Sequence, residues 1–430
     1  MEKPVKIGLL GAGTVGSGVI QVLQENAREV ALKAGAPVKI QAVLVRDAKK
    51  ARQHIDDVLV TDRIEDILED EEIKIVVELM GGLHPAREYM LAAMEAGKHV
   101  VTANKALMAT CGEEIMALAA QQEREIAFEA SVGGGIPIIG PLKHSLIANE
   151  VSSVMGIVNG TTNYMLTRMA NEGISYEDVL AEAQAAGYAE ADPTADVDGL
   201  DAAAKIAILA SLAFNTRISI DQVQAEGIRS ITTADLAAAA DMGYCVKLLA
   251  VANRTEAGID VRVHPAMVPL DHPLATVSGV YNAIYVVGDF VGQTMFFGEG
   301  AGSDATASAV IGDVMEVARH VQAGIDPILG NTYTDKLPLV SPDDLVTRAY
   351  IRFTVAERPG VLAAMSAVFA EHGVSVHSVI QRGKNDGEVA ELVYVTHSAR
   401  EGDLHATLDD IAKLENVLVG PAPTLIRVIK

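Results

Sequence analysis

One segment of the chain gathers acidic residues directly before a helix that carries a single lysine. Residues 190–205 read EADPTADVDGLDAAAK, with five carboxylates in a stretch broken by proline and glycine. Asp201 and Lys205 are four residues apart, so they share one face of the predicted helix. The helix continues as IAILASLAF, and burial of an unpaired ammonium is costly. We therefore expect Lys205 to have a partner and a chemical task, and an exposed helical ion pair is the alternative.

A glycine-rich turn near the N-terminus predicts a dinucleotide-binding site. It follows the apolar segment VKIGLL and precedes a helix with apolar periodicity, which is the context that the GxGxxG pattern requires. Its glycines allow a tight turn and let backbone N–H groups approach a pyrophosphate at the helix N-terminus. A merely structural turn is the alternative. The motif consists of Gly11, Ala12, Gly13, Thr14, Val15 and Gly16.

The residues after the second predicted strand bear on the choice of cofactor. Arg46 and Asp47 follow that strand, with Lys49, Lys50 and Arg52 close behind. Asp47 would bind a ribose 2′-hydroxyl, whereas Arg46 would bind a 2′-phosphate. The neighbouring bases favour NADP(H) over NAD(H), and a solvated basic turn is the alternative.

Two further segments hold candidate ligands. TANK at 102–105 ends a predicted strand at the sheet edge that faces a bound cofactor, so Lys105 can contact the nicotinamide or the substrate. An ordinary surface lysine is the alternative.

FEASVGGGIP at 128–137 is a glycine-rich turn that exposes carbonyl oxygens beside the carboxylate of Glu129. Hard oxygen ligands suit a group I or II cation, and a turn that only supports a domain junction is equally compatible with the pattern.

The composition excludes several classes of protein. The 430 residues are 50% hydrophobic and 21% charged, which predicts a large buried interior and two or three domains. A net charge of −23 without a basic stripe argues against nucleic-acid binding. We find no signal peptide, no apolar run that would span a membrane and no disulfide framework, so we expect a cytoplasmic protein.

The elements that position these residues alternate between strand and helix. This alternation predicts an α/β Rossmann domain with a doubly wound, mostly parallel sheet at residues 1–130, completed by a helix at about 303–325. Residues 131–302 are predicted to form an α+β catalytic and dimerisation domain. After a linker at 331–348, residues 349–430 follow the pattern βαββαβ of a ferredoxin-like module. The N-terminal strands are predicted at residues 5–10, 39–47, 73–79, 98–105 and 125–131.

Taken together, these motifs resemble homoserine dehydrogenase over essentially the whole chain. The C-terminal segment FTVAERPGVLAAMSAVFAEHGVSV resembles an ACT domain, an amino-acid-sensing module. The resemblance implies reversible NAD(P)H-dependent reduction of L-aspartate 4-semialdehyde to L-homoserine, in threonine, methionine and isoleucine biosynthesis. It rests on GLLGAGTVGSGV at 8–19, TANK at 102–105, FEASVGGGIPII at 128–139, GIVNGTTNYML at 156–166, GYAEADPTADVDGLDAAAKIAIL at 187–209 and GEGAGSDATASAV at 298–310.

The resemblance also implies roles for individual residues. Lys205 matches the proton donor to the aldehyde oxygen, and Lys105 matches a lysine that touches both cofactor and substrate. Glu190 and Asp201 match groups that hold the substrate, and the resemblance implies that they do so through its ammonium. Positions that line the cofactor are matched by Gly187 and Gly302. A sodium site is implied at Glu129, Val132, Gly134 and Ile136.

For the C-terminal module the resemblance implies feedback control, with threonine as the expected effector. ACT domains usually bind an amino acid at the turn that here spans residues 357–360, where two modules pair. We therefore expect a homodimer or a homotetramer. A module that only dimerises the chain is the alternative.

Two other functions stay open at this point. A catalytically silent amino-acid sensor would keep the nucleotide-binding domain without turnover, but the intact set of Lys105, Asp201 and Lys205 argues against it. Aspartate-semialdehyde dehydrogenase would need a cysteine nucleophile. The placing of Cys111 and Cys245 gives that reaction little support.

Overall fold

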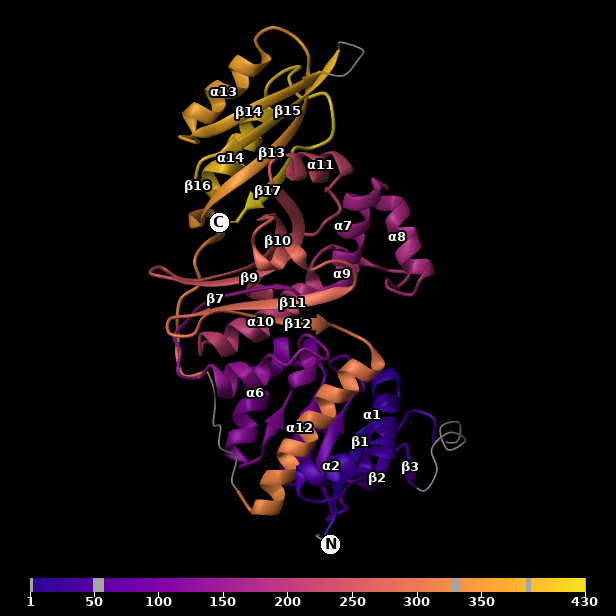
Figure 1. The fold of residues 1–430 in the computed structure, drawn as a ribbon. Helices are drawn as coiled ribbons and strands as arrows, with labels where there is room; N and C mark the ends of the chain where they lie inside the picture. Colours follow the sequence, from indigo (N-terminus) through magenta and orange to yellow (C-terminus); the bar gives the residue numbers. More distant parts are fainter. Residues whose placement is uncertain (1–2, 49–57, 326–332, 384–387, 430) are drawn as a thin grey trace. The chain divides into compact units, whose positions relative to one another are not determined.

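The computed structural model describes residues 3–48, 58–325, 333–383 and 388–429. The chain divides into two compact units, each made of three segments (Figure 1). In the described part of the chain, no helix combines the length and the apolar character needed to cross a bilayer. Unit 1 comprises Met1–Val154, Ala204–Val223 and Tyr281–Lys336, and unit 2 comprises Met155–Ala203, Gln224–Val280 and Leu337–Lys430.

Unit 1 contains the predicted parallel sheet. Six strands of its described residues follow the order β3-β2-β1-β4-β5-β6, and all five neighbouring pairs are parallel. Burial along β1 and β4 is nearly continuous, as expected for a sheet covered by helices on both faces. The prediction of a doubly wound α/β domain is confirmed. The strands are β1 (Val5–Leu10), β2 (Val38–Leu44), β3 (Leu59–Thr61), β4 (Ile73–Glu78), β5 (His99–Thr102) and β6 (Ile126–Ala127).

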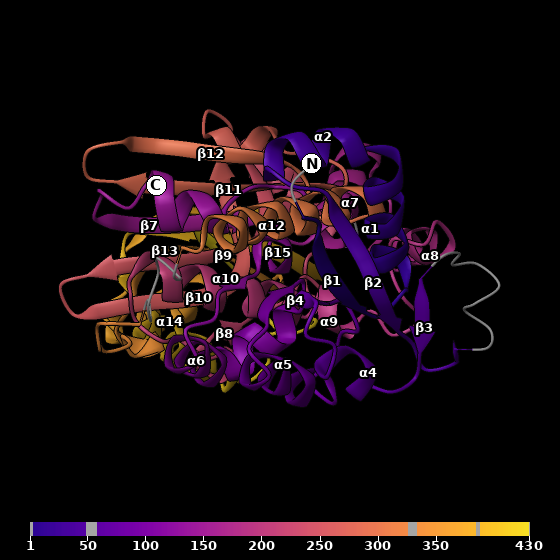
Figure 2. The ribbon, with the colours of Figure 1, turned by 90° about the horizontal axis from the view of Figure 1, so that it is seen from below.

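A helix from late in the sequence, α12, packs with the elements of this sheet domain. Helix α12 packs against α1 near the glycine-rich turn (Figures 1 and 2). A Cβ at Gly18 of α1 would lie 2.7 Å from Oγ of Ser303, so the glycine permits this close approach. The helices of unit 1 are α1 (Thr14–Glu25), α2 (Ala27–Ala34), α4 (Glu65–Leu68), α5 (Ala86–Glu95), α6 (Lys105–Gln121) and α12 (Ser303–Ala323). The shorter elements are η1 (Glu129–Ser131), η2 (Pro141–Ser145) and η3 (Ile220–Gln222), with the antiparallel hairpin β11 (Tyr281–Gly288) and β12 (Gly292–Glu299).

Unit 2 combines helices with a long antiparallel hairpin. Strands β9 (Tyr244–Thr255) and β10 (Gly258–Pro269) pair over twelve residues each, and β8 (Gln224–Ala225) pairs in parallel with β10. Strand β7 (Val151–Ile157) and helix α10 (Leu200–Ala213) each cross the division between the units. The remaining elements here are α7 (Gly160–Glu172), α8 (Tyr176–Ala185), α9 (Thr194–Val197), α11 (Thr233–Asp241) and η4 (Pro273–Thr276).

The C-terminal part of unit 2 has the predicted βαββαβ pattern. Its strands follow the order β17-β13-β15-β14 with antiparallel pairing throughout, which confirms a ferredoxin-like module. Strand β17 also pairs in parallel with β10, so this small sheet continues into the β9–β10 hairpin. The elements are η5 (Pro342–Asp344), β13 (Val346–Ala356), α13 (Val361–Glu371), β14 (Val376–Gly383), β15 (Val389–Thr396), β16 (Ala399–Arg400), α14 (Glu401–Ala412) and β17 (Thr424–Val428).

Several predicted bounds are wrong in detail. Strand β2 ends at Leu44 rather than at residue 47, because the chain turns outward and exposes Arg46. Strand β6 has two residues rather than seven, since a 3-10 turn begins at Glu129. The short β3 and the long β9 were not predicted at all.

Candidate active site

The glycine-rich turn has the geometry of a pyrophosphate cradle. Gly11 has a φ of +100°, and a Cβ there would lie 3.0 Å from the carbonyl oxygen of Leu79. A Cβ at Gly16 would lie 2.2 Å from the carbonyl oxygen of Gly11. Gly13 caps α1, and among the described residues beyond its two chain neighbours no atom lies within 4 Å of the place of its missing Cβ. Backbone N–H groups at this helix start are therefore open to an anion. The rest of the motif, Ala12, Thr14 and Val15, completes the turn and begins the helix.

Gly302 lies beside this turn, as the resemblance implies. It caps α12 with a φ of +118°, a conformation that favours glycine. The next residue, Ser303, donates its hydroxyl to the carbonyl oxygen of Thr14 at 2.9 Å. Two helix N-termini, those of α1 and α12, thus meet at one place in unit 1.

The end of β2 also reaches the turn. The backbone N–H of Gly11 donates to the carbonyl oxygen of Leu44 at 2.9 Å. Arg46 and Asp47 follow two and three residues later, and both are exposed. Three bases that also entered the cofactor prediction lie outside the described residues, namely Lys49, Lys50 and Arg52.

A buried polar network holds the segment that contains Lys105. Glu78, at the end of β4, is fully buried and accepts the hydroxyl of Thr102 at 2.7 Å. The side chain of Asn104 donates to the carbonyl oxygen of Gly82 at 2.7 Å and caps α6. Lys105 is the first residue of α6 and is exposed at the carboxyl edge of the sheet, where it was predicted. Sequence reasoning missed Glu78, although a carboxylate that ends an apolar strand was a usable signal.

Lys205 is a buried cation on an apolar helix. Its side chain is 8% exposed, and the neighbouring helical residues are buried as well. Asp201 lies one turn earlier on α10, as the spacing predicted. An ammonium at such a position is expensive to bury unless it is paired, as we expect of Lys205 from the sequence.

Asp201 belongs to a hydrogen-bonded group in unit 2. The amide of Asn159, which is 5% exposed, donates to Asp201 at 2.9 Å and to Asp196 at 2.7 Å. The oxygen of the same amide accepts the backbone N–H of Thr162 at 2.9 Å and so caps α7. Asn159 therefore orients two carboxylates from the start of one helix. Neither it nor Asp196 was predicted as a site residue, although Asn before a helix is a recognisable cap signal.

Gly187 and Glu190 lie on the loop that follows α8. Gly187 has a φ of +79°, and both residues are exposed. Helix α7 holds the loop through Thr161, whose hydroxyl donates to the carbonyl oxygen of Tyr188 at 2.7 Å. The carboxylate of Glu190 makes no hydrogen bond or ion pair with another described residue. Among the described residues, no hydrogen bond therefore joins the Glu190 carboxylate to the Asn159 group.

Glu129 uses its carboxylate to shape the predicted cation loop. One carboxylate oxygen accepts the N–H groups of Ile138 and Ile139 at 2.6 and 2.8 Å. The other oxygen accepts the N–H of Gly140 at 2.6 Å. The backbone N–H of Glu129 itself donates to Asp313 at 2.8 Å. Both carboxylate oxygens are thus occupied by backbone donors.

The carbonyl groups of the same loop are better suited to a cation. Gly133 and Gly134 have φ values of +77° and +55°, which turn the backbone sharply. Val132, Gly134 and Ile136 are buried, and no described residue donates a hydrogen bond to their carbonyl oxygens. Buried carbonyl groups normally have a partner. A monovalent cation among them would supply one.

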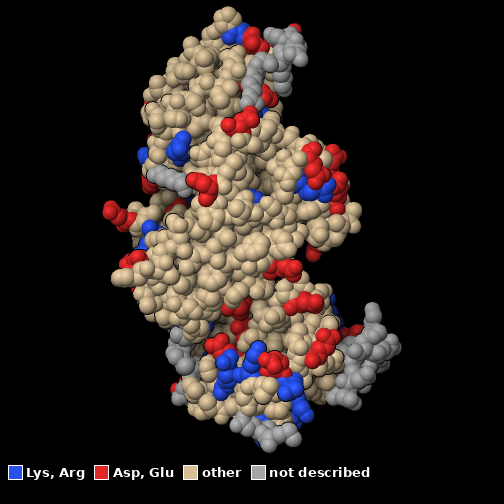
Figure 3. Space-filling model, viewed as in Figure 1, with Lys and Arg blue, Asp and Glu red and all other residues tan. Residues whose placement is uncertain are grey.

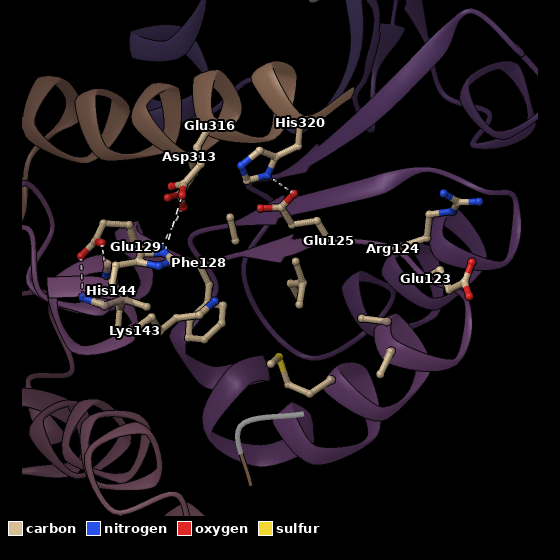
Figure 4. A pocket seen from close by; sticks show the side chains of 17 residues that line it. Glu123, Arg124, Glu125, Phe128, Glu129, Lys143, His144, Asp313, Glu316 and His320 are labelled. Atoms are coloured by element: carbon tan, nitrogen blue, oxygen red, sulfur yellow. Dashed lines mark hydrogen bonds and ion pairs between the residues drawn. The ribbon is translucent and has the colours of Figure 1, made fainter. Parts of the chain in front are cut away.

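A cavity of about 400 Å³ lies along β6 and α12 in unit 1 (Figure 4). Burial raises the pKa of Asp313 to about 8. Burial also lowers the pKa of Lys143, whose ammonium lies 5.3 Å from the centre of the Phe128 ring. Neither Lys105 nor Lys205 is among the described residues that line this cavity, but Glu129 of the predicted cation loop is.

Comparison with known proteins agrees with this arrangement. Family models match in order: the homoserine dehydrogenase NAD binding domain at residues 11–129, homoserine dehydrogenase at 137–315 and the ACT domain at 349–416. A homoserine dehydrogenase from Synechocystis sp. is 49% identical, with 99% of each chain covered. The chain belongs to the homoserine dehydrogenase family. The resemblance inferred from the sequence is confirmed, and the family favours a dehydrogenase over a silent amino-acid sensor.

Solved structures of the family agree over different lengths. The crystal structure of a homoserine dehydrogenase from Thiobacillus denitrificans matches with a TM-score of 0.93 at 40% identity, covering 99% of this chain and 98% of that one. A hyperthermophilic archaeal homoserine dehydrogenase in complex with NADPH matches with a TM-score of 0.63 at 28% identity, covering 73% of this chain and 98% of that one. The chain is thus an NAD(P)-dependent oxidoreductase of the homoserine dehydrogenase family, with an ACT domain at its C-terminus.

Proposed function

We propose that this chain interconverts L-aspartate 4-semialdehyde and L-homoserine, with Lys205 as the proton donor to the aldehyde oxygen. A nicotinamide cofactor supplies the hydride when it is bound. The observation that carries the proposal is the buried ammonium of Lys205 on an apolar helix, one turn after Asp201. As the carbonyl carbon is reduced, negative charge develops on its oxygen, and a nearby ammonium stabilises that charge and neutralises it by proton transfer.

The remaining polar residues hold the substrate in this proposal. Asp201 binds the substrate ammonium, and its orientation is fixed by Asn159. Glu190 is a second carboxylate for the same cation. Lys105 touches cofactor and substrate from the carboxyl edge of the sheet, on a helix start that Asn104 caps. A preorganised carboxylate loses little orientational freedom on binding, which favours the productive pose.

NADP(H) is the proposed cofactor, with NAD(H) as the weaker alternative. Arg46 is exposed two residues after β2, and Gly11 is hydrogen bonded to the last residue of that strand. A guanidinium at this place can pair with a 2′-phosphate. Asp47 next to it would instead accept a ribose hydroxyl. The archaeal relative solved with NADPH supports the first choice.

We also propose a sodium ion at the loop of Val132, Gly134 and Ile136. The carbonyl oxygens of these three buried residues fit a hard monovalent cation. Glu129 is the fourth proposed ligand, and its three amide hydrogen bonds also hold the following segment in place. The ion would fix the loop and would take no part in the proton or hydride transfer.

Regulation by threonine and self-association complete the proposal. The turn at 357–360 is exposed before α13, and Gly360 has a φ of +94° there.

Strand β12, which among the described strands pairs with β11 alone, exposes Met295 and Phe297 by 39% and 54%. Charged side chains are sparse over this hairpin (Figure 3). Such an apolar edge suits pairing with a second copy in a homodimer or homotetramer. Both cysteines are free thiols, which agrees with a cytoplasmic location.

Enzyme assays test the activity directly. The purified chain is incubated with L-homoserine and either NADP⁺ or NAD⁺, and reduced cofactor is followed by its absorbance. We expect oxidation of homoserine with a lower KM for NADP⁺ than for NAD⁺. A folded protein that reduces neither cofactor in the presence of homoserine would refute the proposed activity.

A further inference from the structure

An arginine on the last strand of the C-terminal module is bound to a glutamate of the middle segment of the chain. Arg427 on β17 is 2% exposed. It donates to both carboxylate oxygens of Glu226 at 2.6 and 2.7 Å, and to both carboxylate oxygens of Glu401 at 2.8 Å. Although burial opposes its charge, these hydrogen bonds raise the pKa of Arg427 above its ordinary value. The guanidinium is therefore permanently charged, and its fork holds Glu226 in one orientation.

The residues after Glu226 form a close contact with the acidic loop. Ile228 donates its backbone N–H to the carbonyl oxygen of Val197 at 2.8 Å. A Cβ at Gly227 would lie 1.9 Å from that same oxygen, so only glycine fits between the two segments. The side chain of Arg229 pairs with Asp198. Ile228 and Arg229 thus bind residues 197 and 198, and Gly227 allows the two segments to approach closely.

The fastened loop leads directly to the proposed substrate carboxylate. Asp196, which precedes Val197, shares the amide of Asn159 with Asp201. Gly199 has a φ of +82° and is hydrogen bonded to the carbonyl oxygen of Asp196 at 3.0 Å. A shift of residues 196–199 would therefore change the position of Asp201 or break its hydrogen bond to Asn159.

We infer that Glu226 is a positioning residue, which transmits the placement of β17 to the substrate-binding Asp201. The inference rests on the proposed binding role of Asp201. Arg427 fixes the Glu226 side chain, the backbone after Glu226 fixes residues 197 and 198, and these residues fix the carboxylate pair around Asn159. The C-terminal module thereby completes the substrate site without contributing a residue that touches the substrate.

A second ionic contact shows that this link is separable from simple docking of the module. Arg352 on β13 donates to both carboxylate oxygens of Asp235 on α11, at 2.6 and 2.9 Å. Asp235 is fully buried, and it also accepts the hydroxyl of Tyr350 at 3.1 Å. We expect this contact to hold the C-terminal module at α11 when the Glu226 carboxylate is replaced. Loss of the Glu226 charge should therefore affect the loop more than the fold.

The test compares Glu226→Gln with Asp344→Asn in the full-length chain. Asp344 also pairs with an arginine of the module, Arg400, but both are more than half exposed and neither contacts the acidic loop. We expect Glu226→Gln to raise the KM for homoserine about tenfold, equivalent to one hydrogen bond to a charged group. The KM of Glu226→Gln for NADP⁺ and its melting temperature should stay close to those of the wild type. For Asp344→Asn, both KM values and the melting temperature should stay close to those of the wild type.

A second pair of variants reaches the same loop without changing a charge. Gly227→Ala pushes a methyl group against Val197, whereas Gly312→Ala adds one that would meet no described atom within 4 Å outside its chain neighbours and its own helix backbone. We expect a higher homoserine KM only for Gly227→Ala. Unchanged homoserine KM in both Glu226→Gln and Gly227→Ala would overturn the inference. A rise in the KM for homoserine and in the KM for NADP⁺, together with a lower melting temperature, would also overturn it, since that is the pattern of general destabilisation. Failure of the wild-type chain to oxidise homoserine is seen before any variant is made and refutes the proposed function instead.

Discussion

Replacement of Asp313 by Asn should change how the stability of unit 1 depends on pH. Burial raises the pKa of this carboxyl to about 8 from its ordinary value of 3.8. Between these two values the folded chain holds a proton that the unfolded chain releases. Folding therefore takes up a proton, and the stability contributed by Asp313 is complete below pH 3.8 and is lost as the pH rises through about 8.

The size of the effect follows from the same two values. A shift of about 4 pKa units corresponds to a free energy on the order of 5 kcal/mol across the whole range, because each unit is worth about 1.4 kcal/mol. Asn imitates the protonated carboxyl, since its oxygen can accept the same N–H of Glu129. The variant has no proton to lose, so it should become more stable relative to wild type as the pH rises.

Urea denaturation of both proteins at pH 5, 6, 7 and 8 measures this difference. We expect the free energy of unfolding of Asp313→Asn, minus that of wild type, to rise by about 3 kcal/mol over this range, with about 1.4 kcal/mol per pH unit as the limiting slope. Asp62→Asn, at an exposed carboxyl of the same unit, should show no such trend. A difference that stays flat from pH 5 to pH 8 would show that Asp313 is ionised in the folded chain and that the reasoning is wrong.

The remaining predictions concern the reaction and its control. Lys205→Ala should lower kcat by about 10²–10⁴-fold, the usual contribution of a general acid, with little change in homoserine binding measured by calorimetry; a kcat within a few fold of wild type would exclude this role. Arg46→Ala should raise the KM for NADP⁺ about tenfold and leave that for NAD⁺ nearly unchanged; equal effects on both would contradict the 2′-phosphate contact. Threonine should inhibit the wild-type enzyme, and Gly360→Val should weaken inhibition because its φ of +94° disfavours a side chain. Equal activity with and without threonine would refute feedback control.

The features that the sequence predicts well have a local physical cause. The glycine-rich turn needs small residues at fixed spacings. The motif could therefore be recognised from this spacing together with the predicted strand before it and the predicted helix after it. The burial of Lys205 was predictable because the residues around it on the helix are apolar. The βαββαβ order of the C-terminal module was predictable from strand and helix periodicities alone.

The features that sequence reasoning missed depend on contacts between distant residues. Asn159 and Asp201 are 42 positions apart, and Glu78 and Thr102 are 24 apart. Neither member of such a pair signals the other within a local window. The parallel pairing of β17 with β10 was missed for the same reason, since the paired positions, Ala266 with Arg427 and Met267 with Val428, lie about 160 residues apart in the sequence.

Glu129 shows that a side chain can have a structural task beside the ligand role that the sequence suggests. A carboxylate in a glycine-rich turn suggests a cation ligand, yet here its oxygens accept three backbone N–H groups. The N–H dipoles point their positive ends at the carboxylate, so they compete with a cation for the same lone pairs. The carbonyl groups of Val132, Gly134 and Ile136 have no such competitor among the described residues. The candidate sodium site therefore depends on the backbone conformation at Gly133 and Gly134, which a cation-binding loop requires whatever its side chains are.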